Sequence, residues 1–160
     1  MGNAALGAKH SAMVKIGLIS DTHDRLNPKV LELFKECQYI IHAGDVSHPS
    51  VLERLRQVAP VTCVRGNCDF GPWADELPSR ITQVFAGVQI QVIHNSQYVR
   101  LHPDTKIVIY GHTHRARQYW GCDVLYINPG SASEPRDGLH GKVAILTLDG
   151  ERIEIENYTL

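Results

Sequence analysis

The stretch VKIGLISDTH, residues 14–23, decides the fold class. Its first seven residues are largely apolar and predict a buried strand over 14–20, and an aspartate and a histidine follow directly after it. Asn27 and Pro28 come next and predict the start of a helix, because asparagine caps a first turn and proline fits its first position. The apolar residues that follow share one helical face: Val30, Leu33, Phe34 and Cys37.

The same alternation repeats along the next forty residues. A strand is predicted over 39–44, a helix over 49–59 and a strand over 61–66, which is the β-α-β-α-β order of a parallel sheet. The later strands have no helices between them, which favours a second, more antiparallel sheet: 81–94 (two strands around Gly87), 106–112, 124–130, 142–148 and 152–158. We therefore expect an α/β protein in which two sheets face each other, with helices outside.

Length and composition indicate one globular unit. The chain has 160 residues, of which 43% are hydrophobic, and a chain of that size can bury about 70% of its unfolded surface in one core. Residues 1–13 are small or polar and are expected to form a disordered leader, whereas residues 14–160 form a single domain.

Charge and cysteine content limit the partners and the compartment. A net charge of −1 favours neither a stable nucleic-acid complex nor a membrane surface, and no apolar run reaches the roughly 18 residues of a membrane span. The four cysteines form no C-x-x-C pair. Cys37, Cys63 and Cys122 are interpreted as reduced core residues of a cytoplasmic protein, and Cys68 is considered separately below.

Polar side chains follow five of the predicted strands at their carboxyl ends, where α/β sheets bind ligands. They are expected to converge on one spot: Asp21, His23, Asp45, Asn67, His94, His112 and His114. Taken singly, each has a simpler explanation, since Gly44-Asp45 is ordinary turn chemistry and a lone histidine is usually structural. The ordered set points to a site. The other histidines are given no functional role: His10, His42, His48, His102 and His140.

Convergence of these groups raises an electrostatic conflict. Two partly buried carboxylates without cations repel each other and take up protons, and divalent metal ions remove that conflict. Four imidazoles, two carboxylates and one amide oxygen suffice for two ions, with one carboxylate shared. With a bridging hydroxide such a site carries a charge of +1 and attracts an anion such as a phosphodiester. Gly111 is expected to let the backbone bend before the two histidines that follow.

The motifs ISDTH, HAGDV, VRGNCD, VIH, YGHTH and NPGS occur in the order seen in the calcineurin-like metallophosphoesterases. The chain most resembles the small bacterial and archaeal phosphodiesterases of that superfamily, which are related to the retromer subunit. The resemblance covers about residues 14–150 and implies a four-layer α-β-β-α sandwich with a dinuclear site. It assigns one metal to Asp21, His23, Asp45 and His114, and the other to Asp45, Asn67, His94 and His112.

The resemblance also implies the chemistry. We expect two divalent ions, Mn²⁺ in first place with Ni²⁺, Fe²⁺ or Zn²⁺ as alternatives, and attack of a bridging hydroxide on phosphorus. Asn67, Cys68 and His112 are the candidate catalytic residues, and a small phosphodiester is the expected substrate. A phosphomonoesterase or a scaffold without catalytic activity is the alternative, and a homo-oligomer is left open. Arg65, Arg115 and Arg136 are either phosphate contacts or solvated surface residues.

Three departures from the broad family bear on the site. Cys68 stands where larger relatives carry a histidine that protonates the leaving group, and a thiol is a weak donor. It either limits the enzyme to activated aryl esters or only fills space. After His94 the family's Gly-His is replaced by Asn95-Ser96, and the helix expected over 95–105 must be short or absent, which leaves the site more open on that side.

Overall fold

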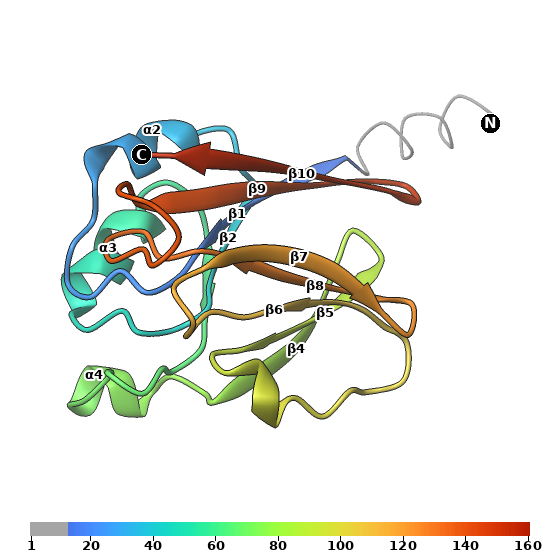
Figure 1. The fold of residues 1–160 in the computed structure, drawn as a ribbon, viewed down its shortest axis with the longest axis horizontal. Helices are drawn as coiled ribbons and strands as arrows, with labels where there is room; N and C mark the ends of the chain where they lie inside the picture. Colours follow the sequence, from blue (N-terminus) through green and yellow to red (C-terminus); the bar gives the residue numbers. More distant parts are fainter. Residues whose placement is uncertain (1–12) are drawn as a thin grey trace.

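The computed structural model describes residues 13–160, so the predicted leader lies outside the described residues apart from Met13. Two sheets of five strands are stacked face to face (Figure 1). The first sheet contains β1 (Val14–Ile19), β2 (Tyr39–His42), β3 (Val61–Cys63), β9 (Lys142–Asp149) and β10 (Arg152–Thr159), in the order β10-β9-β1-β2-β3. The second contains β4 (Arg80–Phe85), β5 (Val88–Ile93), β6 (Thr105–Ile109), β7 (Ala116–Gly121) and β8 (Val124–Pro129), in the order β4-β5-β6-β8-β7.

The parallel β1-β2-β3 arrangement is confirmed, but the last two strands belong to the first sheet and not to the second. Strand β9 lies antiparallel to β1. Its side chains are apolar on both faces, with Val143 and Ile145 packed under the helices and Leu146 and Leu148 between the sheets. A strand that is apolar on both faces needs cover on both, which explains its central position. Strand β10 alternates exposed and half-buried residues and forms the edge.

The second sheet is mixed. Strands β5, β6 and β8 run parallel, whereas β4 and β7 are antiparallel edge strands. The sequence reasoning missed β7, because its exposed polar residues lack the apolar run of a buried strand. It also placed Cys122 in the core, which is wrong: Cys122 is exposed in the β7–β8 turn, where both Cys122 and Asp123 have a positive φ. A tight hairpin turn requires that backbone.

The helices are short and cover mainly the first sheet (Figure 1). They are α2 (Pro28–Leu33), α3 (Pro49–Arg56), α4 (Pro72–Asp75) and the 3₁₀ turn η1 (Ser96–Tyr98). The side chain of Asn27 caps α2, as predicted, and His48 caps α3. Both helices end earlier than expected, but Phe34 and Cys37 remain buried in the turn after α2.

On the outer face of the second sheet, η1 is the only helical segment within residues 95–105, which confirms the expectation of a short or absent helix there. The α/β class with two mixed sheets is also confirmed. The main core lies between the sheets and is built by apolar side chains of both, including Leu18, Ile41, Ile90 and Ile109. Within residues 13–160, no helix combines the length and apolarity that crossing a lipid bilayer requires.

Candidate metal centre

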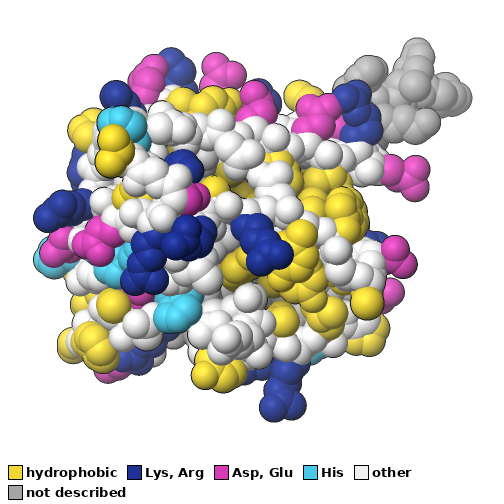
Figure 2. Space-filling model, in the orientation of Figure 1, with side chains coloured by type: hydrophobic (Ala, Val, Ile, Leu, Met, Phe, Trp, Pro, Cys, Tyr) yellow, Lys and Arg dark blue, Asp and Glu magenta, His cyan; other side chains and the backbone are white. Residues whose placement is uncertain are grey.

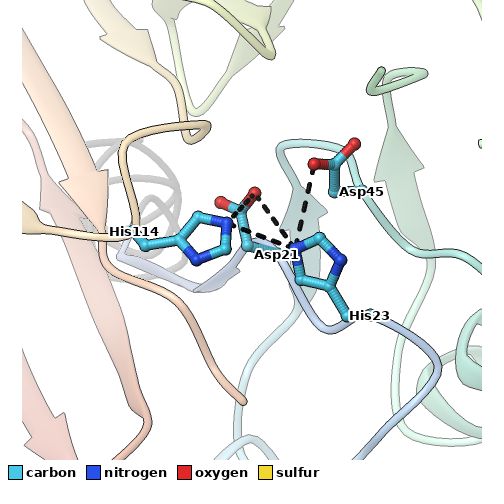
Figure 3. A group of neighbouring side chains, drawn as sticks. All are labelled: Asp21, His23, Asp45 and His114. Carbon is cyan, nitrogen blue, oxygen red and sulfur yellow. Dashed lines mark hydrogen bonds and ion pairs between the residues drawn. The ribbon is translucent and has the colours of Figure 1, made fainter. Parts of the chain in front are cut away.

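All seven predicted site residues follow strands whose carboxyl ends open on the same side of the sandwich. Four of them form a tight group in which the ligand atoms all lie within 4.8 Å of one another: Asp21, His23, Asp45 and His114 (Figure 3). The Nε2 atom of His114 lies 3.4 Å from Asp21 Oδ1 and 3.2 Å from His23 Nε2. Asp45 Oδ2 lies 3.8 Å from His23 Nε2. Imidazoles and carboxylates from distant parts of the chain therefore share one small volume.

The other three residues lie beside this group. His112 Nδ1 is 3.2 Å from Asn67 Oδ1, and the rings of His112 and His94 are 5.2 Å apart and nearly perpendicular. His94 Nε2 is 3.3 Å from Asp45 Oδ2. Asp45 Oδ2 thus lies between the two groups, in the position that a shared carboxylate would need.

Backbone carbonyl groups fix which nitrogen of two histidines faces the site. His94 Nδ1 lies 2.7 Å from Ala43 O, and His114 Nδ1 lies 2.6 Å from Glu134 O. A carbonyl only accepts, so each Nδ1 carries the proton and donates it. Both Nε2 atoms then present lone pairs to the site. A carbonyl group that orients a histidine in this way is the usual outer support of a metal ligand.

The electrostatics fit a bound cation. Asp21 Oδ1 and His94 Nε2 are buried and have no hydrogen-bond partner in residues 13–160. Burial raises the pKa of Asp21, although the Ser20 hydroxyl donates to its Oδ2 at 2.6 Å. Asp45 is buried as well, and the backbone N–H of Cys68, which donates to Asp45 Oδ1 at 2.8 Å, favours the ionised carboxylate. Lone pairs and carboxylate oxygens facing one another without a proton or cation would repel, so these residues suit a divalent metal ion.

Asp69, which the sequence reasoning did not single out, holds the loops that carry Asp45 and Asn67. It is fully buried and accepts hydrogen bonds from the backbone N–H groups of Asp45 (3.0 Å), Ser47 (2.7 Å) and Gly66 (2.7 Å). One carboxylate thus ties the turn after β2 to the turn after β3. The motif that contains Asn67 and Cys68 ends at this aspartate, and that was the available signal.

His42, which the sequence reasoning gave no role, supports the site from below. Its Nδ1 accepts the Gly44 N–H at 3.1 Å, so its Nε2 carries the proton and donates to Thr22 Oγ1 at 3.1 Å. Burial lowers the pKa of His42 to about 3, and the ring stays neutral. Both nitrogens are therefore used within the protein, which distinguishes His42 from the histidines that face the site.

The backbone at the site is unusual. A positive φ, which is uncommon outside glycine, occurs at five of the seven residues: Asp21, His23, Asp45, His112 and His114. Such backbones cost free energy and cluster at functional sites. The bend therefore occurs at the histidines themselves, and not at Gly111 as expected. Gly111 is needed for space, because a Cβ there would lie 1.9 Å from Ser20 Oγ.

Cys68 and two of the three candidate arginines line a cavity at the site, whereas the third arginine is paired elsewhere. Arg115, Arg136 and Cys68 line a cavity of about 670 Å³ with the site residues, which we call the arginine pocket. Figure 2 shows Lys and Arg side chains gathered next to histidines on the left of the face it presents. Arg65 is bound to Asp75 at 3.1 Å instead. Burial, followed by the charge of Asp45, raises the pKa of the Cys68 thiol to about 11.

Imidazoles and carboxylates gathered at the mouth of an α/β sandwich are typical of metal-dependent hydrolases. Residues 14–151 match the calcineurin-like phosphoesterase superfamily domain, and the chain belongs to that family. This confirms the predicted resemblance and the prediction that the protein is an enzyme, a hydrolase of phosphoric esters. The roles given to the seven individual residues stay predictions.

Similar proteins agree with this family. A probable metallophosphoesterase of Methanothermobacter thermautotrophicus is 33% identical over 88% of this chain and 90% of its own. A phosphodiesterase of Methanocaldococcus jannaschii is 30% identical over 92% of this chain and 99% of its own. Among solved structures, an archaeal phosphodiesterase has a TM-score of 0.75 at 27% identity, with 91% of this chain and 99% of that chain covered. Vacuolar protein sorting 29 of Cryptosporidium parvum shares the fold, with a TM-score of 0.73 at 19% identity, over 92% of this chain and 99% of that one.

Proposed function

We propose that this protein hydrolyses phosphodiester bonds by a two-metal mechanism in which a bridging hydroxide is the nucleophile. One observation carries the proposal: His94 Nε2 and His114 Nε2 lie 3.3 Å and 3.4 Å from carboxylate oxygens of Asp45 and Asp21, and within residues 13–160 the buried Asp21 Oδ1 and His94 Nε2 have no hydrogen-bond partner. When bound, two divalent ions would supply the hydroxide and neutralise charge on the phosphoryl oxygens.

The chain's own residues divide into two ligand sets with one shared member. Asp21, His23 and His114 would hold one ion, with Asp45 as the shared carboxylate. The other ion would take the second group of residues, Asn67, His94 and His112. Mn²⁺ remains the first expectation, although nitrogen and oxygen donors without sulfur suit Fe²⁺, Ni²⁺ and Zn²⁺ as well.

Substrate positioning falls to groups around this centre. The exposed amide of Asn67 and the partly exposed ring of His112 border the arginine pocket, where Arg115 and Arg136 offer positive charge to a phosphoryl group. Cys68 lies in the same cavity, and its weak S–H group is a poor source of a proton for a leaving alkoxide. We therefore expect good rates with aryl phosphodiesters and slow rates with alkyl phosphodiesters.

A metal-reconstitution experiment tests this function. The metal-free protein is loaded with Mn²⁺, the bound metal is counted by elemental analysis, and hydrolysis is followed with bis-aryl and mono-aryl phosphates. Two ions per chain and faster turnover of the diester are expected. Preference for the monoester would make the protein a phosphomonoesterase, and neither metal nor turnover would favour a scaffold.

A pair of variants controls for nonspecific effects. Asp45→Asn removes the shared carboxylate and should lower the metal content and the rate of hydrolysis by at least about 100-fold, in line with the loss of a metal ligand. Asp75→Asn removes an exposed carboxylate outside the site and should change neither. Equal metal content in Asp45→Asn and the unmodified protein would contradict the proposed ligand sets.

A further inference from the structure

A second cavity opens beside the metal centre, on the side away from the arginine pocket. It measures about 310 Å³ and is lined by the site residues Asn67, His94 and His112 together with Arg80, Ile93 and Tyr98, among others. We call it the η1 pocket, after the turn that carries Tyr98. Asn67 and His112 also line the arginine pocket. These two residues therefore form a wall between the cavities, and the η1 pocket has no part in the function proposed above.

The η1 pocket presents an exposed aromatic side chain on a capped turn. Tyr98 is 64% exposed, which is unusual for so large an aromatic residue. Its backbone is held in the turn, because its N–H donates to Asn95 O at 3.1 Å. The Asn95 side chain caps the turn by accepting the Gln97 N–H at 3.0 Å. The turn begins directly after His94, so a short and capped segment places Tyr98 in the same cavity as His94 and His112. Rings presented in this way stack on planar groups.

The η1 pocket also offers one unpaired positive charge. Two arginines line it, and Arg65 is already committed, since its guanidinium binds Asp75 Oδ1 at 3.1 Å and Asp69 O at 3.0 Å. The guanidinium of Arg80 forms no hydrogen bond or ion pair within residues 13–160. Strand pairing places Arg80 opposite Ile93, whose strand ends at the site. A polar substituent on a bound ring would therefore find a donor at the rim.

We propose that the η1 pocket binds a planar aromatic ester group of the phosphodiester, which stacks on Tyr98 and turns a polar edge to Arg80. A phosphodiester has two ester groups, and a phosphorus held at the Asn67–His112 wall directs one into each cavity. The inference rests on the proposed function and extends it to a substrate class. A simple aryl group and a nucleobase share the required chemistry.

Binding of stable phosphinates tests the pocket without turnover. Diphenylphosphinate and dimethylphosphinate carry the same anion and differ only in the groups that would fill the pockets. Titration calorimetry on the Mn²⁺-loaded protein should show tighter binding of the diphenyl compound. Tyr98→Ala should weaken binding of the diphenyl compound about tenfold, as expected for a lost stacking contact. The affinity for the dimethyl compound should change by no more than about twofold. Tyr98→Phe should keep the preference, and Trp120→Ala, which removes an exposed aromatic residue outside this pocket, should change nothing.

Kinetics identify the source of the ring. Bis(4-nitrophenyl) phosphate and thymidine 5′-(4-nitrophenyl) phosphate release the same nitrophenolate and differ in the retained group. Tyr98→Ala should raise KM for at least one of them, and the larger rise identifies the preferred ring. Arg80→Gln should raise KM more for the thymidine ester than for the bis-aryl ester, because the carbonyl oxygens of thymine accept a guanidinium hydrogen bond more strongly than nitro oxygens do.

The outcomes separate the two proposals. Hydrolysis of phosphodiesters with an unchanged preference for diphenylphosphinate in Tyr98→Ala would overturn the aromatic subsite and leave the proposed function standing. Metal-loaded protein that hydrolyses no phosphodiester and binds neither phosphinate would overturn both.

Discussion

Replacing Asp69 with asparagine should loosen the metal centre, although Asp69 faces none of the ligand groups. Its carboxylate receives three backbone N–H bonds at 2.7 to 3.0 Å, two on Oδ2 and one on Oδ1. An asparagine keeps one oxygen and turns an NH₂ group toward donors, so at least one buried N–H loses its acceptor and the others lose a charged partner. Hydrogen bonds to a charged group each contribute about 1.5–3 kcal/mol.

The expected loss in the free energy of unfolding is therefore about 3–5 kcal/mol, less than three full bonds because one oxygen remains. Since small domains have a stability of about 5–15 kcal/mol, the variant should still fold. Urea unfolding of metal-free protein, followed by circular dichroism, measures the loss. Asp75→Asn is the matched control, because its exposed ion pair with Arg65 should contribute less than about 1 kcal/mol.

Metal affinity gives a second measurement on the same variant. Asp69 ties together the turns that carry Asp45 and Asn67, so its loss should weaken Mn²⁺ binding about 10- to 100-fold, the usual effect of removing an outer support. A stability loss below about 1 kcal/mol together with unchanged metal affinity would refute the reasoning, because it would mean that the two turns hold their positions without this carboxylate.

Three further outcomes are expected. Gly17→Ala should destabilise the protein by about 1–3 kcal/mol in urea unfolding, since its Cβ would lie 2.7 Å from the buried Phe34 ring, and an unchanged midpoint would disprove this contact. His42 has a folded pKa of about 3, below its ordinary 6.5, so the unfolded chain binds the proton first and His42 lowers stability as the pH falls below 6.5. In His42→Asn the fall in stability between pH 6.5 and pH 4 should be shallower by up to about 1.4 kcal/mol per pH unit, and parallel pH profiles would exclude this role. Cys68→His should raise the rate with alkyl phosphodiesters at least about tenfold relative to aryl ones, whereas Cys122→His should not, and equal effects of the two would leave Cys68 as a space-filling residue.

Much of the fold could be predicted because strands and helices of the first half alternate with clear apolar runs. Strand β7 could not, since an edge strand with exposed Arg117 and Gln118 resembles a loop in sequence. Local sequence patterns also could not predict the sheet to which β9 belongs. Its position depends on which apolar faces remain uncovered once β1 and β2 have paired, and that is decided by packing across the whole chain.

The site divides in the same way. The seven candidate residues could be found because each follows a predicted strand, and polar groups at strand ends converge by construction of the fold. Asp69 was signalled only by its place at the end of the motif around Asn67. Its role, like that of His42, depends on hydrogen bonds that form only once the turns have folded. The tautomers of His94 and His114 likewise depend on carbonyl groups distant in the sequence.

The brief crossing from β5 to β6 has an evolutionary consequence. Only η1 and an exposed segment connect His94 to Thr105, and this connection lies on the outer surface, where loops tolerate changes in length. Insertions there would change the side chains that line one wall of the site. The strand ends that carry the candidate ligands would keep their positions in the sandwich. Libraries of variants confined to residues 96–104 are thus a route to new substrate ranges with the candidate ligand residues unchanged.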